Sequence, residues 1–114
     1  MSDQSVIVWD LETVPDLKAA ARSLSIVSVL DFNVGVDRAN ISPHHWIYFP
    51  ENEFIFSRVG FPANFSSTVA PAGTSSIYIE ITYSPRTPPD PEAAYARAIA
   101  DLRRCGVLRC WRSY

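Results

Sequence analysis

Glycine is scarce in this chain, with four residues among 114, at Gly35, Gly60, Gly73 and Gly106. No two of them are two positions apart, so the sequence contains no Gly-x-Gly-x-x-Gly turn. Such a turn lets backbone amides approach a pyrophosphate group at the amino end of a helix. Its absence excludes a dinucleotide-binding site of that type from this sequence.

Cysteine and long apolar runs are also sparse. Two cysteines, Cys105 and Cys110, are too few for a disulfide framework, and with His44 and His45 they match no usual zinc-ligand spacing. No segment approaches the ~20 apolar residues of a membrane-spanning helix, and no charged start leads into a signal-like apolar run. We therefore expect a cytoplasmic protein without a membrane anchor.

Charge and composition indicate one globular domain. Ten basic residues against twelve acidic ones give a formal net charge of -2, which provides no general attraction to nucleic acid or anionic membranes. The chain is 47% hydrophobic and has three Trp, five Tyr and six Phe to fill an interior. Its length suits a single domain, which usually has about 100 to 150 residues.

The residue pattern predicts an α+β fold with a small antiparallel sheet of three to four strands. Expected strands cover residues 26–36, 45–49, 54–61 and 76–83, with the second and third joined as a hairpin and a loop over 62–76. Alternation in the last strand places Ile77, Ile79 and Ile81 on one buried face.

In the sequence, one helix is expected before the strands of the sheet and one after them. Residues 91–105 should form a C-terminal helix, because Asp90 can cap it, Pro91 suits its first position and Gly106 can end it. An N-terminal strand at 6–9 and a short helix beginning near Asp16 are expected to attach to the sheet.

Four segments of the predicted sheet resemble a known family in their order and spacing. They are residues 33–36 (NVGV), 44–51 (HHWIYFPE), 56–65 (FSRVGFPANF) and 70–80 (APAGTSSIYIE), followed by a helix and glycine stop in 98–108. Together, residues 26–109 resemble the substrate-domain sheet of flavin-dependent amine-oxidase-like proteins, the group related to protoporphyrinogen oxidase and UDP-galactopyranose mutase.

This resemblance implies a sheet that faces an FAD held by a separate nucleotide-binding domain. Tyr48, Arg58 and Asn64 resemble family positions that could line the substrate surface, although we favour a structural role for each, in cross-strand packing and loop hydrogen bonds. Because redox chemistry in such proteins belongs to the flavin, we expect a truncated, non-catalytic module that binds no cofactor alone. The expected partners are a flavin-binding domain in trans, or a second copy that associates through an exposed sheet face.

Residues 6–17 (VIVWDLETVPDL) carry a different resemblance, to the first motif of DEDD-type three-prime to five-prime exonucleases of the family B polymerase kind. It implies that Asp10 and Glu12 bind Mg or Mn ions, which activate water. The further carboxylate motifs of that family are missing, so we favour plain strand-end polar residues, with metal binding as the alternative.

The two resemblances meet near residue 25 and divide the chain into three parts. Residues 1–24 form an exonuclease-like segment, 25–109 an amine-oxidase-like sheet and helix, and 110–114 a tail. Our hypothesis is a chimeric fusion of fragments or a gene remnant. An exonuclease fragment is the alternative function.

Overall fold

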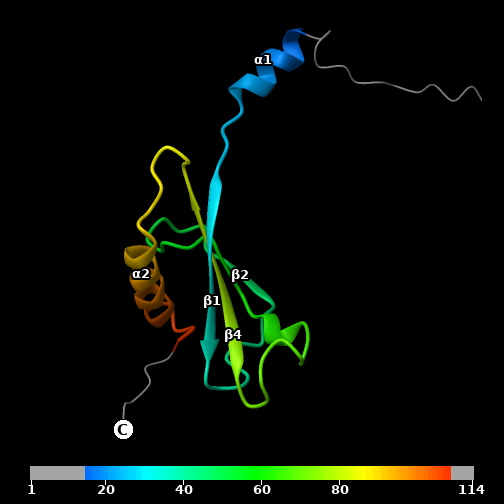
Figure 1. Cartoon of the computed structure of the whole chain (residues 1–114), viewed down its shortest axis with the longest axis vertical. Coiled ribbons are helices and arrows are strands. Elements are labelled where there is room, and N and C mark those ends of the chain that lie inside the picture. Colours follow the sequence, from blue (N-terminus) through cyan, green and yellow to red (C-terminus); the bar gives the residue numbers. More distant parts are fainter. Residues whose placement is uncertain (1–14, 109–114) are drawn as a thin grey trace, which may run out of the picture.

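The computed structural model describes residues 15–108. Its elements along the chain are α1 (Pro15–Ser23), β1 (Ser28–Val36), β2 (Trp46–Tyr48), β3 (Arg58–Gly60), the 3-10 helix η1 (Pro62–Asn64), β4 (Ser75–Tyr83) and α2 (Pro91–Arg104). Figure 1 shows the strands as one sheet beside α2. The predicted α+β fold with a C-terminal helix is confirmed. No helix within 15–108 is both long enough and apolar enough to cross a bilayer.

All four strands are antiparallel in the order β1-β4-β3-β2. The long strands β1 and β4 pair over nine residues, from Ser28 opposite Tyr83 to Val36 opposite Ser75. The short strands β2 and β3 form the expected hairpin, and Phe49 N–H extends it by donating to Ser57 O at 2.9 Å. The two edges of the sheet are therefore β1 and β2.

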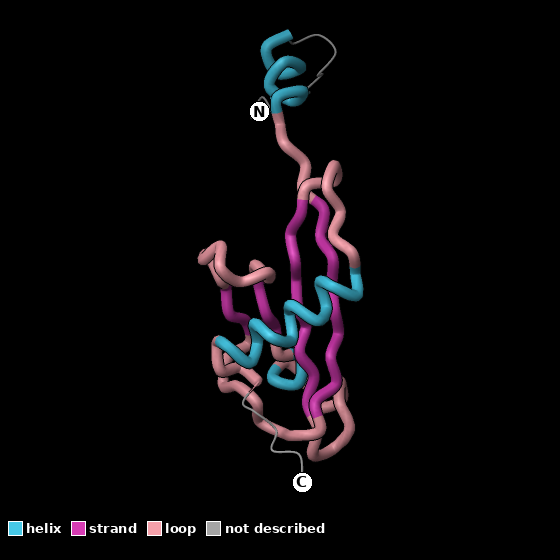
Figure 2. The backbone as a smooth tube through the Cα atoms, turned by 90° about the vertical axis from the view of Figure 1, so that its left-hand side faces the viewer, coloured by secondary structure: helices cyan, strands magenta, loops and turns pink. Residues whose placement is uncertain are grey.

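The core lies between the sheet and α2, which crosses one face of the strands (Figure 2). Ile77, Ile79 and Ile81 of β4 are buried there, as their alternation predicts. The remaining buried apolar side chains are those of Phe56, Val59, Phe61, Ala94, Ala98 and Leu102. Alternation also places Ile47 of β2 on this side.

Both ends of α2 follow the sequence signals. The Asp90 carboxylate accepts a hydrogen bond of 2.8 Å from Ala93 N–H, and Pro91 occupies the first turn. After Arg104 the chain leaves the helix through Gly106, whose φ of +82° suits a residue without a Cβ.

The expected third strand is shorter than predicted, since only Arg58–Gly60 of residues 54–61 forms a strand. Phe56, Val59 and Phe61 are all buried. A regular strand sends even- and odd-numbered side chains to opposite faces, so it cannot bury all three. The chain bends between Phe56 and Arg58, and Phe56 packs against Phe49 and Phe54.

The expectation that the first helix attaches to the sheet is wrong. Helix α1 lies beyond the end of the sheet (Figure 1), and no residue in 16–27 is buried. Its short length and small apolar stripe give it little surface to bury, and Leu24, Ile26 and Val27 after it stay exposed. The predicted strand at 6–9 lies outside the described residues.

Candidate functional site on the open sheet face

The sheet face opposite α2 carries a cluster of polar and aromatic side chains, which we call the open face. The strand register arranges it in two rows across the sheet. One row is Asp31, Glu80, Arg58 and Tyr48, and the other is Asn33, Tyr78, Gly60 and Trp46. Each of the four strands contributes one residue to each row.

Arg58 is the centre of the first row. Its Nε donates to Glu80 Oε2 at 2.9 Å, and its Nη2 donates to Glu80 Oε1. Its Nη1 donates to Tyr48 Oη at 3.3 Å. This two-point pairing with a carboxylate fixes the plane of the guanidinium. Hydrogen bonds to Glu80 and then to Tyr48 raise the pKa of Arg58, so its charge is permanent.

The same guanidinium also packs against two aromatic rings. The Arg58 Cζ atom lies 4.6 Å from the ring centroid of Trp46 and 5.6 Å from that of Tyr48. Contacts within about 6 Å of a ring centroid are cation–π interactions. Arg58 therefore orders both rings of β2, although Tyr48 is 67% exposed.

Trp46 lies at the far end of the second row and covers Gly60. A Cβ added at Gly60 would approach the indole to 2.2 Å, so the ring occupies the space that any larger residue would fill. The edge of the indole meets Tyr78 at a centroid distance of 5.8 Å. The ring centroid of Phe65, which follows η1, lies 5.8 Å from that of Trp46 and 4.7 Å from that of His45. These contacts extend the aromatic surface to the border of the sheet.

Tyr78 connects the aromatic end of the face with Asp31 on β1. The hydrogen bond with the Asp31 carboxylate, together with desolvation, raises the pKa of the Tyr78 hydroxyl. The carboxylate disfavours a second negative charge beside it, so the phenol stays protonated at neutral pH.

The structure brings together two of the three predicted substrate residues. Tyr48 and Arg58 are cross-strand neighbours joined by a hydrogen bond. Asn64 has a different set of contacts, since its Nδ2 donates to Ser42 O at 2.9 Å and to His44 O at 2.6 Å. It ties η1 to the loop before β2.

The predicted metal residues Asp10 and Glu12 lie outside the described residues. Within 15–108, no group of three or more His, Cys, Asp or Glu side chains is placed to hold a metal ion. The prediction of Mg or Mn binding at residues 10 and 12 therefore stays a prediction.

Sequence reasoning missed Trp46, Glu80 and Tyr78 as members of the site. The signal was present, because alternation in residues 45–49 and 76–83 places all three on the face away from the isoleucines. What the sequence did not contain was the register, which sets Arg58 opposite Glu80.

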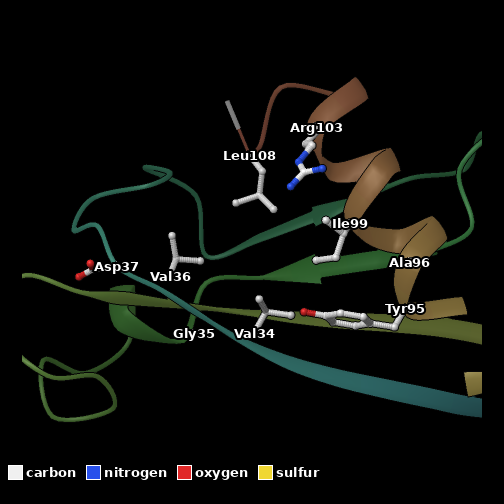
Figure 3. A pocket seen from close by; sticks show the side chains of 9 residues that line it. All are labelled: Val34, Gly35, Val36, Asp37, Tyr95, Ala96, Ile99, Arg103 and Leu108. Carbon is white, nitrogen blue, oxygen red and sulfur yellow. The ribbon is translucent and has the colours of Figure 1, made fainter. Parts of the chain in front are cut away.

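A separate cavity of about 690 Å³ lies on the helix side of the sheet (Figure 3). In the close-up, Tyr95 of α2 lies beside Val34 of β1, and Ile99 and Leu108 lie across the cavity from this strand. Its lining is mostly apolar and borders the free edge of β1.

The open face combines a paired guanidinium with a protonated phenol and exposed aromatic rings. Its guanidinium is paired with Glu80, and its phenol at Tyr78 stays protonated. Exposed aromatic rings around a paired arginine provide rigid apolar area with few rotatable bonds, as protein-binding surfaces do.

No family model and no curated protein matches the chain. Among solved structures, the fold is similar to reduced UDP-galactopyranose mutase, with a TM-score of 0.68 and 22% sequence identity. The match covers 87% of this chain but 22% of the mutase chain, so the chain spans about a fifth of that protein. The likeness shows that this chain shares its fold with part of that mutase. No comparison supports the exonuclease resemblance of residues 6–17.

Proposed function

We propose that this chain is a substrate-domain-like module of the flavin-oxidoreductase type, without redox activity of its own. The fold match to UDP-galactopyranose mutase supports the domain type. The missing Gly-x-Gly-x-x-Gly turn supports the lack of a flavin site, because the chemistry of such enzymes resides in the cofactor.

The observation that carries the proposal is the ordered aromatic cluster on the open face. Arg58, Trp46 and Tyr48 are held in fixed positions by Glu80 and by each other. Keeping these side chains ordered costs conformational entropy. An ordered Trp, Tyr and Arg cluster that remains partly exposed has the composition of an interaction hot spot.

The occupant that we propose for this face is a flavin-binding domain on a separate chain. The mutase chain is several times longer than the matched region, so it holds much structure outside that region. FAD would come with the partner domain, and a nucleotide sugar is the substrate class that the mutase's name indicates. Tyr48 and Arg58 would then face the shared site, while Asn64 would keep the neighbouring loop in place.

A complementation experiment tests this proposal. UDP-galactopyranose mutase lacking the region that this chain matches would be mixed with the module, and assembly measured by analytical ultracentrifugation. We expect an FAD-containing complex whose affinity falls about tenfold or more in Trp46→Ala, as truncation of a hot-spot aromatic usually costs.

Tyr95→Ala is the matched control, since Tyr95 is an exposed aromatic residue on α2, on the other side of the sheet. Equal affinities of the wild type and Trp46→Ala would contradict docking through the open face, and so would the absence of any complex.

A further inference from the structure

The free edge of β1 differs from the other edge of the sheet. Strand β1 has nine residues, SVLDFNVGV, without proline or lysine, and among the strands within 15–108 it pairs with β4 on one side alone. The opposite edge, β2, has three residues between Pro43 and Pro50. Natural sheets protect their edges with short strands, proline and lysine. By these criteria β2 is protected and β1 is not.

We infer that β1 is a dimerisation edge that pairs antiparallel with β1 of a second copy of this chain. The two four-stranded sheets would then form one continuous sheet about a two-fold axis. This inference rests on the strand edge and is independent of the docking proposed for the open face.

Geometry limits the register of this pairing. To keep both α2 helices on one side of the joined sheet, core-side residues of one β1 must lie opposite core-side residues of the other. The two-fold axis must therefore pass through a residue of β1, and the registers that satisfy this differ by two residues in the pairing. Pairing all nine residues places Phe32 opposite the partner's Phe32 on the axis. The two rings then form an aromatic cross-strand pair beside Tyr95, which already contacts Phe32 at 5.3 Å.

Charge favours the same register. With Phe32 on the axis, Asp31 of each copy lies opposite the partner's Asn33, so the one charged residue of the strand meets an amide. Moving each strand by one residue, which shifts the axis to Asp31, would set two carboxylates opposite each other, an arrangement that destabilises sheets. The register with the greatest overlap therefore avoids a pair of like charges.

The apolar cavity beside β1 supports a strand at this edge. Val34 and Val36 line it from β1, and Ile99 and Leu108 line it from the helix side (Figure 3). In the proposed register, the partner's Leu30 lies opposite Val34 and the partner's Ser28 opposite Val36. Leucine at the mouth of the cavity would cover apolar surface that is open to water in a single copy.

Sedimentation equilibrium of the whole chain over a range of concentrations, with two opposite substitutions at Asn33, tests the inference. Asn33→Lys would face the partner's Asp31 and tighten the dimer about tenfold, because two symmetric charge pairs form. Asn33→Asp would place carboxylates together and weaken it by a similar factor. Raised salt would reduce both effects.

Asn52→Lys and Asn52→Asp are matched controls, since Asn52 is exposed in the turn between β2 and β3 and the net charge changes equally. We expect both to leave the dimer unchanged, with circular dichroism confirming the fold of each variant. Because the Asn33 variants act in opposite directions, failure of one to fold leaves the other decisive. A monomer at every concentration would overturn the inference, and so would a dimer whose affinity is the same in the wild type and both Asn33 variants.

Discussion

The indole of Trp46 lies directly over Gly60, its cross-strand neighbour in the β2–β3 hairpin. Gly60 is buried because this ring covers it, although Trp46 itself is 37% exposed. The ring therefore has the backbone of β3 beneath it and the guanidinium of Arg58 beside it. The orientation of the open face depends on this contact.

Gly60→Ala should displace the indole. The new methyl group would lie 2.2 Å from the ring, so either the Trp46 rotamer or the hairpin must shift, at a cost of about 1–3 kcal/mol in the free energy of unfolding. Tryptophan fluorescence in a Trp9→Phe/Trp111→Phe background would report a red shift as the ring becomes wetter. An unchanged spectrum and stability would show that Trp46 does not rest on Gly60. Gly35→Ala on β1 is the control, because nothing lies within 4 Å of a Cβ there.

Arg58→Lys should loosen the open face despite keeping the charge. A lysine ammonium cannot pair with both Glu80 oxygens and stack on two rings at once. We expect a melting temperature lower by a few degrees and greater mobility of the Tyr48 ring in NMR relaxation. Arg86→Lys in the exposed loop before α2 serves as the control for side-chain type. Equal melting of the two variants would contradict the role of the planar guanidinium.

Asp101 holds the chain before β3 against α2. Asp101 is 1% exposed, and its carboxylate accepts a 2.9 Å hydrogen bond from Ile55 N–H and pairs with Arg97 at 3.0 Å. Asp101→Ala should lower the free energy of unfolding by about 2–4 kcal/mol, because a buried amide loses its acceptor. Asp101→Asn keeps an acceptor for Ile55 and should cost less. Denaturant unfolding measures both, and equal losses would show that the charge rather than the amide acceptor matters.

Tyr78 should ionise at a pH above the ordinary pKa of a tyrosine. Its folded-state pKa is raised above the ordinary value of about 10, first by the Asp31 hydrogen bond and then by desolvation. Its contribution to stability is therefore complete below that pH and is lost as the pH rises through the folded-state pKa. In an ultraviolet titration of tyrosinate, Tyr78→Phe should remove a part of the absorbance change that occurs above the ordinary tyrosine pKa. A titration in which Tyr78→Phe removes an early phase would contradict the Asp31 contact.

Much of the fold follows from local signals in the sequence. The isoleucine alternation of β4 and the Asp90-Pro91 start of α2 specify a buried face and a helix end within a few residues. The prediction of a strand over 54–57 was wrong. Phe56, Val59 and Phe61 are all buried although their positions are both even and odd, so the chain must bend, and local β-propensity does not indicate such a bend. The packing of α1 was also wrong, since a periodic stripe predicts a helix but not what covers it.

The candidate site was less predictable than the fold. Tyr48 and Arg58 could be named from the resemblance, but the Glu80 partner depends on the cross-strand register. The sequence does not distinguish Asp101 from the other charged residues of α2. Its burial depends on contact with a loop 46 residues earlier in the chain. Register and long-range burial are properties of the assembled sheet, which one sequence does not display.

The most direct test of the central claim is size-exclusion chromatography with a full absorbance spectrum, on the chain expressed alone with FAD supplied in excess. The account predicts a folded protein peak without the visible absorption bands of a flavin, because the sequence contains no Gly-x-Gly-x-x-Gly turn of the kind that binds the pyrophosphate. Flavin that co-elutes in stoichiometric amount with the protein would contradict it and show that this module holds a cofactor of its own.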